Sequence, residues 1–259
     1  EMFFEDAKIA SRELELVLTG RECGLEERAP MCGIPYHAAN GYLGRLISRG
    51  YKVAICEQVE DPALAKGIVK RDVIKVITPG TFNDGNFIEE DKNNFIMSIY
   101  TSEESKSAAV AYVDISTGEL YASEFALEYE KIIDEIYKVM PSEIILREDM
   151  HPEVYNSILS LSNIYMNKKA VEYFIDDAEA VVEEQLSTKD YSNSSLLYPL
   201  AALLKYIFDT QKTSLSNINN VQIYNVEQYI TIDINSRRNL EITETLREKS
   251  KKGSLLWVL

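Results

Sequence analysis

The sequence predicts a mixed α/β protein with two domains followed by the start of a third. The chain has 259 residues, 46% of them hydrophobic, which is long for one domain and sufficient for two buried cores. Apolar residues recur at helical spacing in some segments and form short β-branched runs in others. A polar, turn-rich stretch at 81–94 interrupts these patterns and predicts a linker that is mobile.

The first domain is expected to span residues 1–80. Its elements are a helix over 1–14, a strand over 16–19, a loop from Arg28 to His37, a helix over about 40–49, a strand over 51–59, a helical turn over 62–66 and a strand over 69–78. Pro30 and Pro35 fix φ and stiffen the loop. Asn40 is expected to cap the second helix, and Gly50 is expected to end it.

The second domain is expected to span 95–226. Its elements are strands over 95–100, 108–115 and 119–125, a helix over 127–140, a strand over 143–146, a helix over 152–161, a strand over 163–166, and helices over about 176–187 and 195–212. This order predicts a mixed sheet covered by helices. The segment after 221 reads as extended and is followed by the start of a helix, and the final S-L-L-W-V-L stops within an element. Trp257 is therefore expected to pack against a part of a longer parent chain.

The net charge of −15 argues at first against nucleic acid as a partner, but the charge is unevenly distributed. Residues 1–80 hold 11 basic and 12 acidic side chains, a net of −1, and the remaining residues hold 16 and 30, a net of −14. Residues 41–75 hold 7 basic and 4 acidic side chains, a net of +3. A phosphate-binding surface is therefore expected in the first third, and the acidic remainder is expected to face protein or solvent.

Neither a membrane span nor a signal peptide is visible, so the cytoplasm is the expected location. The three cysteines have no C-x-x-C spacing and the chain holds only two histidines, which makes a zinc site or a disulfide framework improbable. Cys32 and Cys56 are expected to be small core residues.

Three stretches in the first domain carry a family resemblance: P-M-C-G-I-P-Y-H at 30–37, V-A-I-C-E-Q-V-E-D-P at 53–62, and K-G-I-V-K-R-D-V-I-K-V-I-T-P-G-T at 66–81. Together they resemble the N-terminal mismatch-recognition domain of the MutS family of DNA mismatch repair proteins. The resemblance implies that residues 1–80 bind DNA and that 95–226 form the family's connector domain, whose architecture is ribonuclease-H-like. By the same resemblance, residues 227–259 would begin the helical domain that forms the family's core and lever region.

The family reads mispairs with a phenylalanine wedge, one intervening residue and a glutamate, and Glu1 resembles that glutamate. The wedge would lie two positions upstream of Glu1, outside this sequence. Inserting an apolar ring kinks duplex DNA, and the cost of unstacking is lowest at a mispaired base. Further DNA contacts are implied by position in the matching stretches: Arg21, Met31, Pro35, Tyr36, His37, Lys66, Lys70 and Arg71.

Simpler interpretations of these residues stay open. Glu1 taken alone fits an N-terminal helix charge, and Met31 and Tyr36 fit core packing equally well. His37 fits a surface or loop-stabilising role better than metal ligation.

The resemblance also implies partners: double-stranded DNA with mismatches or small loops, MutL, and a second copy of the parent protein in a homodimer. It implies ATP and Mg²⁺ as cofactors of the parent, with no cofactor, metal site or catalytic residue in the present segment. The spacing of Gly80 and Gly85 resembles a phosphate-binding loop but lacks the required Lys and Ser or Thr, so no nucleotide site is expected there. The expected location is the bacterial cytoplasm, in association with the nucleoid.

Two alternatives remain open at this point. A ribonuclease-H-like sheet with Asp114 and Glu119 at strand ends is compatible with a two-metal nuclease, for which Asp134, Glu135 and Glu143 are further carboxylates. The second domain alone also fits a pure protein-interaction module.

Overall fold

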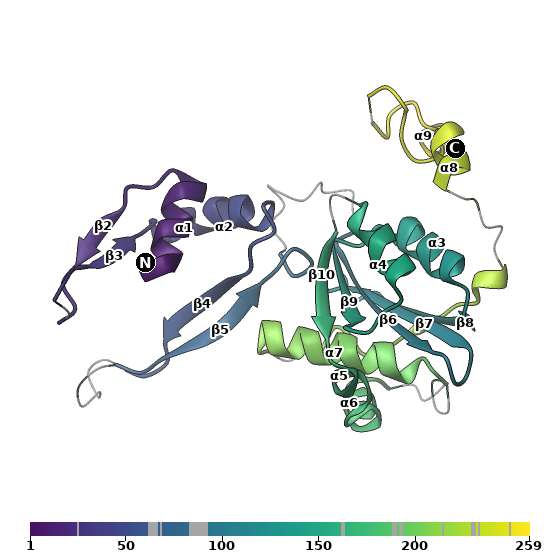
Figure 1. The fold of residues 1–259 in the computed structure, drawn as a ribbon, viewed down its shortest axis with the longest axis horizontal. Helices are drawn as coiled ribbons and strands as arrows, with labels where there is room; N and C mark the ends of the chain where they lie inside the picture. Colours follow the sequence, from purple (N-terminus) through teal and green to yellow (C-terminus); the bar gives the residue numbers. More distant parts are fainter. Residues whose placement is uncertain are drawn as a thin grey trace. The chain divides into compact units, whose positions relative to one another are not determined.

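The computed structural model describes residues 1–24, 26–61, 67, 69–82, 93–161, 164–187, 191, 194–213, 215–228, 232, 234–248 and 250–259. The chain divides into two compact units (Figure 1). The first comprises Glu1–Asn94, Asp114–Thr117 and Leu204–Asn217, and the second comprises Phe95–Val113, Gly118–Leu203 and Ile218–Leu259. No helix in the described parts is long and apolar enough to cross a membrane.

The first unit begins with two small sheets and two helices. Its elements are β1 (Met2–Phe3), α1 (Phe4–Leu14), β2 (Thr19–Arg21), β3 (Ala29–Cys32), a 3-10 turn η1 (Tyr36–Ala38), α2 (Ala39–Ile47), β4 (Val53–Gln58) and β5 (Arg71–Ile77). One sheet has the order β1-β3-β2, and β4 and β5 form a separate antiparallel pair. Ala7, Ala10 and Leu14 of α1 pack with Cys32 and Leu46 to form the core between α1, β3 and α2.

Helix α2 ends where the sequence predicts but starts differently. Gly50 has φ +81°, and its N–H donates to the Ile47 carbonyl at 2.8 Å, which confirms Gly50 as the C-terminal stop. The N-terminal cap is Ala38, so the prediction for Asn40 was wrong. The reason is that η1 continues directly into α2, which places Asn40 inside the helix.

Three further predictions for the first unit were wrong. The strand expected over 16–19 lies at Thr19–Arg21, and the expected loop from Arg28 contains the strand β3, paired on both sides despite Pro30. Cys32 is buried as predicted, and burial raises the pKa of its thiol. Cys56 is exposed, so the prediction that it is a core residue was wrong. Cys56 lies in the two-stranded β4–β5 hairpin, where a register shift falls between Ile55 and Cys56.

The second unit is built on a six-stranded mixed sheet, which confirms the predicted fold class. The elements from residue 95 onward are β6 (Phe95–Ser102), β7 (Ser107–Asp114), β8 (Leu120–Ala126), α3 (Tyr129–Val139), β9 (Glu143–Arg147), α4 (Pro152–Leu159), β10 (Tyr165–Lys169), α5 (Val171–Ile175), α6 (Ala178–Gln185), α7 (Leu197–Gln211), β11 (Gln222–Ile223), η2 (Val226–Gln228), α8 (Ile234–Asn239) and α9 (Leu255–Val258). All of them lie in the second unit except Asp114 and the part of α7 from Leu204, which belong to the first. The strand order is β10-β9-β6-β7-β8-β11. β7 and β8 are antiparallel, whereas β9 runs parallel to both β6 and β10. Adding two parallel strands beside the first strand of a meander gives the ribonuclease-H-like order.

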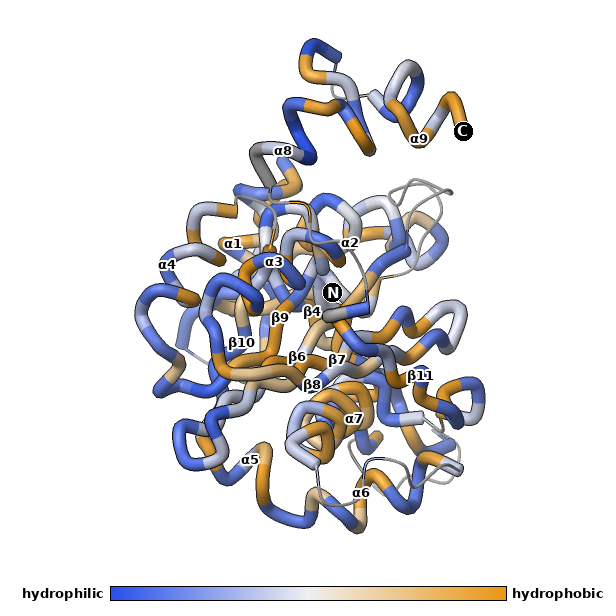
Figure 2. Tube along the Cα trace, turned by 90° about the vertical axis from the view of Figure 1, so that its right-hand side faces the viewer, coloured by the Kyte–Doolittle hydropathy of each residue, from blue (hydrophilic) through white to orange (hydrophobic). Residues whose placement is uncertain are grey.

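Helices cover both faces of this sheet. α3 and α4 lie on one face, and α5, α6 and the start of α7 lie on the other (Figures 1 and 2). Strand β6 contributes to both layers because successive side chains alternate between faces. Met97 and Ile99 pack in the core with α3 and α4, whereas the ring of Tyr100 lies 6.0 Å from Phe174 of α5 and 4.5 Å from Tyr198 of α7, measured between centroids.

Asp114 ends β7 as a buried, fully engaged carboxylate. It accepts hydrogen bonds from the Asn94 N–H at 3.0 Å, the Ser116 N–H at 2.8 Å and the Ser116 hydroxyl at 2.5 Å. The Asn94 amide donates in turn to the carbonyls of Pro79 and Phe82. Asp114 therefore fixes both the turn after β7 and the segment that precedes β6.

A second buried carboxylate joins α3 to the segment after β11. The Tyr224 hydroxyl donates to Glu135 at 2.5 Å, and the Lys138 ammonium pairs with the same carboxylate at 3.1 Å. Burial and the adjacent Glu135 raise the pKa of Tyr224, which keeps this phenol protonated. The apolar side chains of α9 are exposed to solvent, including Trp257 at 55% exposure. Their expected packing against a parent chain stays a prediction.

Candidate nucleic-acid interface

The β1-β3-β2 sheet sets the positions of the first predicted contact residues. Phe3 and Thr19 flank Met31 on its two sides, and Arg21 faces Ala29. The Thr19 hydroxyl donates to the Met31 carbonyl at 2.9 Å, which ties β2 to β3 beside the ladder. This pairing brings Arg21 and Met31 together on one small sheet, with Glu1 directly before its strand β1, although the three residues are distant in sequence.

Glu1 and Arg21 form an ion pair that the sequence did not suggest. The Arg21 Nη1 lies 2.8 Å from the Glu1 carboxylate oxygen Oε2, and the two side chains are 55% and 56% exposed. Exposed ion pairs typically contribute about 0–1 kcal/mol, so this one can open at little cost. Both charged groups are therefore accessible to a ligand on this sheet.

The segment after β3 presents Pro35, Tyr36 and His37 to solvent. Pro35 holds φ at −62°, and its carbonyl accepts the Ala38 N–H at 3.0 Å, which closes the η1 turn. The Tyr36 side chain is 88% exposed and Met31 is half-buried, so Tyr36 is not a core residue. An exposed aromatic ring on a stiff turn is well suited to contact a flat or apolar surface.

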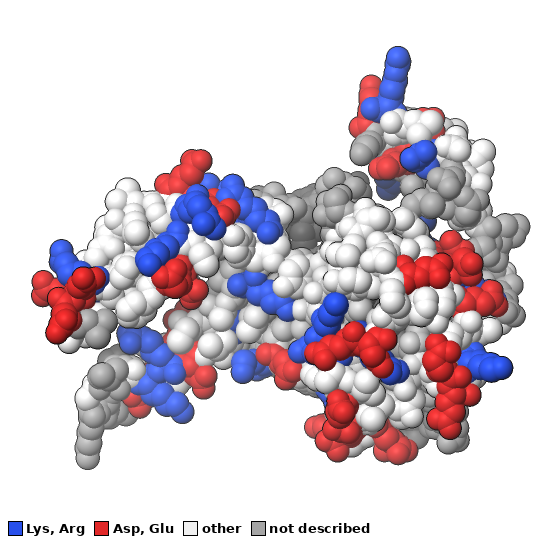
Figure 3. All heavy atoms as spheres, in the orientation of Figure 1, with Lys and Arg blue, Asp and Glu red and all other residues white. Residues whose placement is uncertain are grey.

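The β4–β5 hairpin carries the remaining predicted contacts. Arg71 begins its second strand and Lys70 directly precedes it, and both side chains are exposed. Figure 3 shows basic side chains gathered along this hairpin. In Figure 1 the hairpin and the β2–β3 pair both extend toward the same end of the first unit. Lys66 lies outside the described residues.

Other basic residues of the first unit are held by contacts within the chain. Arg49 donates to the Glu13 carboxylate at 2.7 Å and to the Glu13 carbonyl, and the Tyr51 hydroxyl donates to the same carboxylate at 3.2 Å. Hydrogen bonds from Arg12 and Arg49 hold the pKa of Glu13 below its ordinary value. These side chains tie α1 to the end of α2, so the net charge of +3 at 41–75 overstates the charge that remains for phosphates.

The carboxylates proposed for a nuclease do not converge on a metal site. Asp114 is bonded to Asn94 and Ser116, Glu135 is bonded to Tyr224 and Lys138, and Glu143 is fully buried and accepts the Asn167 amide on β10. Within the described ranges, no group of three or more His, Cys, Asp or Glu side chains is placed to hold a metal ion.

Comparison with known proteins gives matches over both predicted domains. The model described as MutS domain I matches residues 1–86, and the model described as MutS domain II matches residues 94–219. The chain belongs to the MutS family. The matched models are domains I and II, so the family's ATPase region is not among the parts matched here.

Individual MutS relatives match the chain along its whole length. The DNA mismatch repair protein MutS of Clostridium perfringens is 58% identical over 260 residues, and that of Clostridium tetani is 54% identical over 261 residues. The chain spans 29% of the length of each of these curated relatives. A Fowlpox virus resolvase, solved with Holliday junction DNA, gives a TM-score of 0.34 at 14% identity, covering 44% of this chain and 97% of the resolvase; so remote a likeness carries no argument.

The MutS assignment leaves the roles of individual side chains as predictions. The structure places Arg21 and Met31 on one sheet, with Glu1 directly before its strand β1. Pro35, Tyr36 and His37 lie on the turn that follows β3, and Lys70 and Arg71 lie on a separate hairpin. The Glu1–Arg21 pair was missed because its members lie 20 positions apart and share no local pattern.

Proposed function

We propose that residues 1–80 bind duplex DNA and kink it at mispaired or unpaired bases, as part of a longer MutS protein that acts in mismatch repair. The observation that best supports this proposal is the match to MutS domain I over a unit whose sheet edge, turn and hairpin present predicted contact side chains to solvent. Arg21, Lys70 and Arg71 would neutralise phosphates, and binding would release counterions.

Mispair selectivity would come from the ease of deforming the duplex. A wedge ring supplied by the parent chain would enter the base step, at a cost of about a few kcal/mol that is lowest where pairing is already lost. Glu1 would accept one hydrogen bond from the displaced base. When Arg21 turns to a phosphate, the exposed ion pair opens and the Glu1 carboxylate becomes available for that bond.

The second unit would act as the connector between DNA and the rest of the parent protein. By family membership it would relay the DNA-bound state to an ATPase region that holds ATP and Mg²⁺, and to the partner MutL, within a homodimer in the bacterial cytoplasm. The nuclease alternative gains no support, because Asp114, Glu135 and Glu143 are engaged in contacts within the chain.

The proposal is tested by fluorescence anisotropy with the full-length parent and three duplexes: one with a G·T pair, one with a single-base bulge and one fully paired. Glu1→Ala removes a hydrogen bond to a charged group, worth about 1.5–3 kcal/mol, so preference for mispaired DNA should fall about 10- to 100-fold. Glu5→Ala is the control, because Glu5 is an exposed acid of α1 paired only with Lys8 at 2.6 Å among the described residues. A mispair preference that is unchanged in Glu1→Ala would contradict the proposed role.

A further inference from the structure

The second unit contains a cavity of about 620 Å³ that neither the DNA contacts nor the sheet core explains. Its walls come from the end of β6 and the turn after it, from α6 and from the start of α7, with Tyr100, Glu104, Glu179, Leu197 and Tyr198 among the lining residues. Pockets for small ligands and side chains commonly have volumes of about 300–1,000 Å³. The cavity is therefore large enough to take several side-chain groups of a partner.

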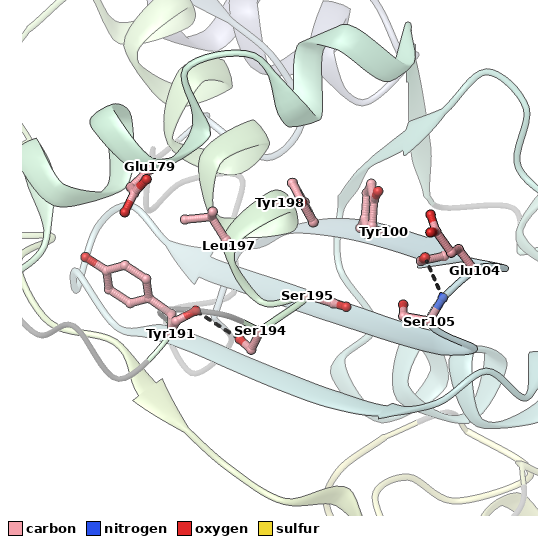
Figure 4. Close-up of a pocket in the computed structure, with 10 residues that line it drawn as sticks. Tyr100, Glu104, Ser105, Glu179, Tyr191, Ser194, Ser195, Leu197 and Tyr198 are labelled. Atoms are coloured by element: carbon pink, nitrogen blue, oxygen red, sulfur yellow. Dashed lines mark hydrogen bonds between the residues drawn. The ribbon is translucent and has the colours of Figure 1, made fainter.

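The described lining of the cavity carries two negative charges and no positive charge. Glu104 and Glu179 are exposed and lie toward opposite ends of the cavity (Figure 4). In the described parts of the chain neither carboxylate has a cationic partner, and the lining includes no lysine or arginine. A ligand that carries positive charge at two separated points would match this arrangement.

Between the two carboxylates lies an aromatic and apolar surface. The rings of Tyr100 and Tyr198 lie 4.5 Å apart at 33°, with Leu197 beside Tyr198. The Tyr100 ring already has the Arg147 guanidinium carbon 5.3 Å from its centroid, and two bonds to Asp149, at 2.8 and 2.5 Å, neutralise that arginine. This contact shows that a guanidinium group packs well against the aromatic wall.

Serine hydroxyls line one side of the same cavity. Ser105 Oγ and Ser107 Oγ are 2.7 Å apart, and Ser107 Oγ lies 2.6 Å from Ser195 Oγ. Ser105 and Ser195 both face the cavity. Hydroxyls both donate and accept, so they can bond the carbonyl and N–H groups of an extended peptide.

We propose that this cavity, hereafter the tyrosine–glutamate groove, binds a basic peptide segment of a partner protein. One arginine or lysine would pair with Glu104, another would pair with Glu179, and the intervening chain would lie over Tyr100 and Tyr198. A bare metal ion does not fit, because no described group of three ligating side chains exists. Nucleic acid does not fit either, because its phosphates would be repelled by both carboxylates. The inference does not depend on the DNA-binding role of the first unit.

The test uses the full-length parent without DNA and a fluorescein-labelled peptide with two arginines separated by a Gly-Ser spacer. The same peptide with citrulline in place of arginine is the neutral comparison. Glu104→Gln and Glu179→Gln should each weaken arginine-peptide binding about two- to fivefold, and the double variant about five- to twentyfold. Tyr198→Leu should weaken binding about two- to fivefold, whereas Tyr198→Phe, which keeps the ring, should restore it.

The matched control is Glu130→Gln combined with Glu172→Gln, which removes two exposed charges outside the groove. If this control weakened peptide binding as much as the groove variants do, the effect would be one of general charge, and the groove would be refuted as the binding site. Equal binding of the citrulline peptide would overturn the requirement for positive charge. If spermidine displaced the labelled peptide as strongly as unlabelled peptide does, the proposal that the groove binds a peptide would be refuted. These outcomes are independent of mismatch binding, so a failure here leaves the DNA proposal standing.

Discussion

Replacing Lys70 and Arg71 by alanine tests whether the β4–β5 hairpin holds the DNA backbone. Both side chains are exposed, and among the described residues neither makes an ion pair. The Lys70 backbone N–H donates to Glu60 and Arg71 pairs with Gln58 through the main chain, so alanine keeps these hairpin contacts. The change should therefore affect binding and leave folding intact.

The expected magnitude follows from counterion release. Each neutralised phosphate contributes about 0.9 to the slope of log affinity against log salt, so two lost contacts should reduce the slope by about 1 to 2. Across a fourfold rise in salt, a slope change of about 1 to 2 means that the wild type loses about 4- to 16-fold more affinity than the variant. Paired and mispaired duplexes should be affected equally, because phosphate contacts carry no sequence information.

The assay is an anisotropy titration of the full-length parent at four salt concentrations with paired and G·T duplexes. Lys8→Ala combined with Arg45→Ala is the control, since it removes the same charge from α1 and α2 of the same unit. If the slope of log affinity against log salt were unchanged in the Lys70 and Arg71 variant, the hairpin would not be part of the DNA interface. An equal change in the control would show a general effect of net charge.

Three further predictions concern stability. Asp114→Ala leaves the N–H groups of Asn94 and Ser116 without their acceptor and should cost about 2–3 kcal/mol in urea unfolding; a loss below 0.5 kcal/mol would refute the structural role of Asp114. Tyr224→Phe removes the hydrogen bond to the buried Glu135 carboxylate and should cost about 1.5–3 kcal/mol by the same measurement, whereas an unchanged midpoint would contradict it. The pKa of Glu13 is lowered in the folded chain, so the ionised side chain contributes to the free energy of unfolding above the ordinary pKa of 4.5, and this contribution is lost as the pH falls. Glu13→Gln should therefore make the free energy of unfolding fall less steeply in acid. A variant whose free energy of unfolding depends on pH as in the wild type would refute this.

The sequence predicts well those features that arise from repeated or local patterns. The helix around Leu43 and Leu46 and its stop at Gly50 follow from apolar spacing and a glycine with positive φ. The hairpin of β7 and β8 follows from two largely apolar runs, 108–115 and 119–125, joined by the turn-forming residues at 116–118. Such patterns specify element type strongly, because many residues agree on one period.

Features that depend on long-range pairing were not predictable in the same way. Strand β3 was read as a loop because Pro30 removes a donor, yet strands on both sides pair with it. Cys56 was read as buried because its neighbours are apolar, whereas burial depends on whether a second layer covers that face of the hairpin. The tyrosine–glutamate groove combines Glu104 with residues 75 or more positions away, and no single window of sequence contains that combination.

Photo-crosslinking from the Tyr36 position tests most directly whether the turn after β3 contacts DNA. Tyr36 is 88% exposed, so a benzoylphenylalanine replacement should leave the fold of the full-length parent intact. Leu159 on α4, which is 54% exposed, is the control position in the second unit. A crosslink to G·T duplex from position 36, with little or none from position 159, is expected. Equal crosslinking from both positions, or none from position 36 under saturating DNA, would contradict the assignment of this surface to DNA binding.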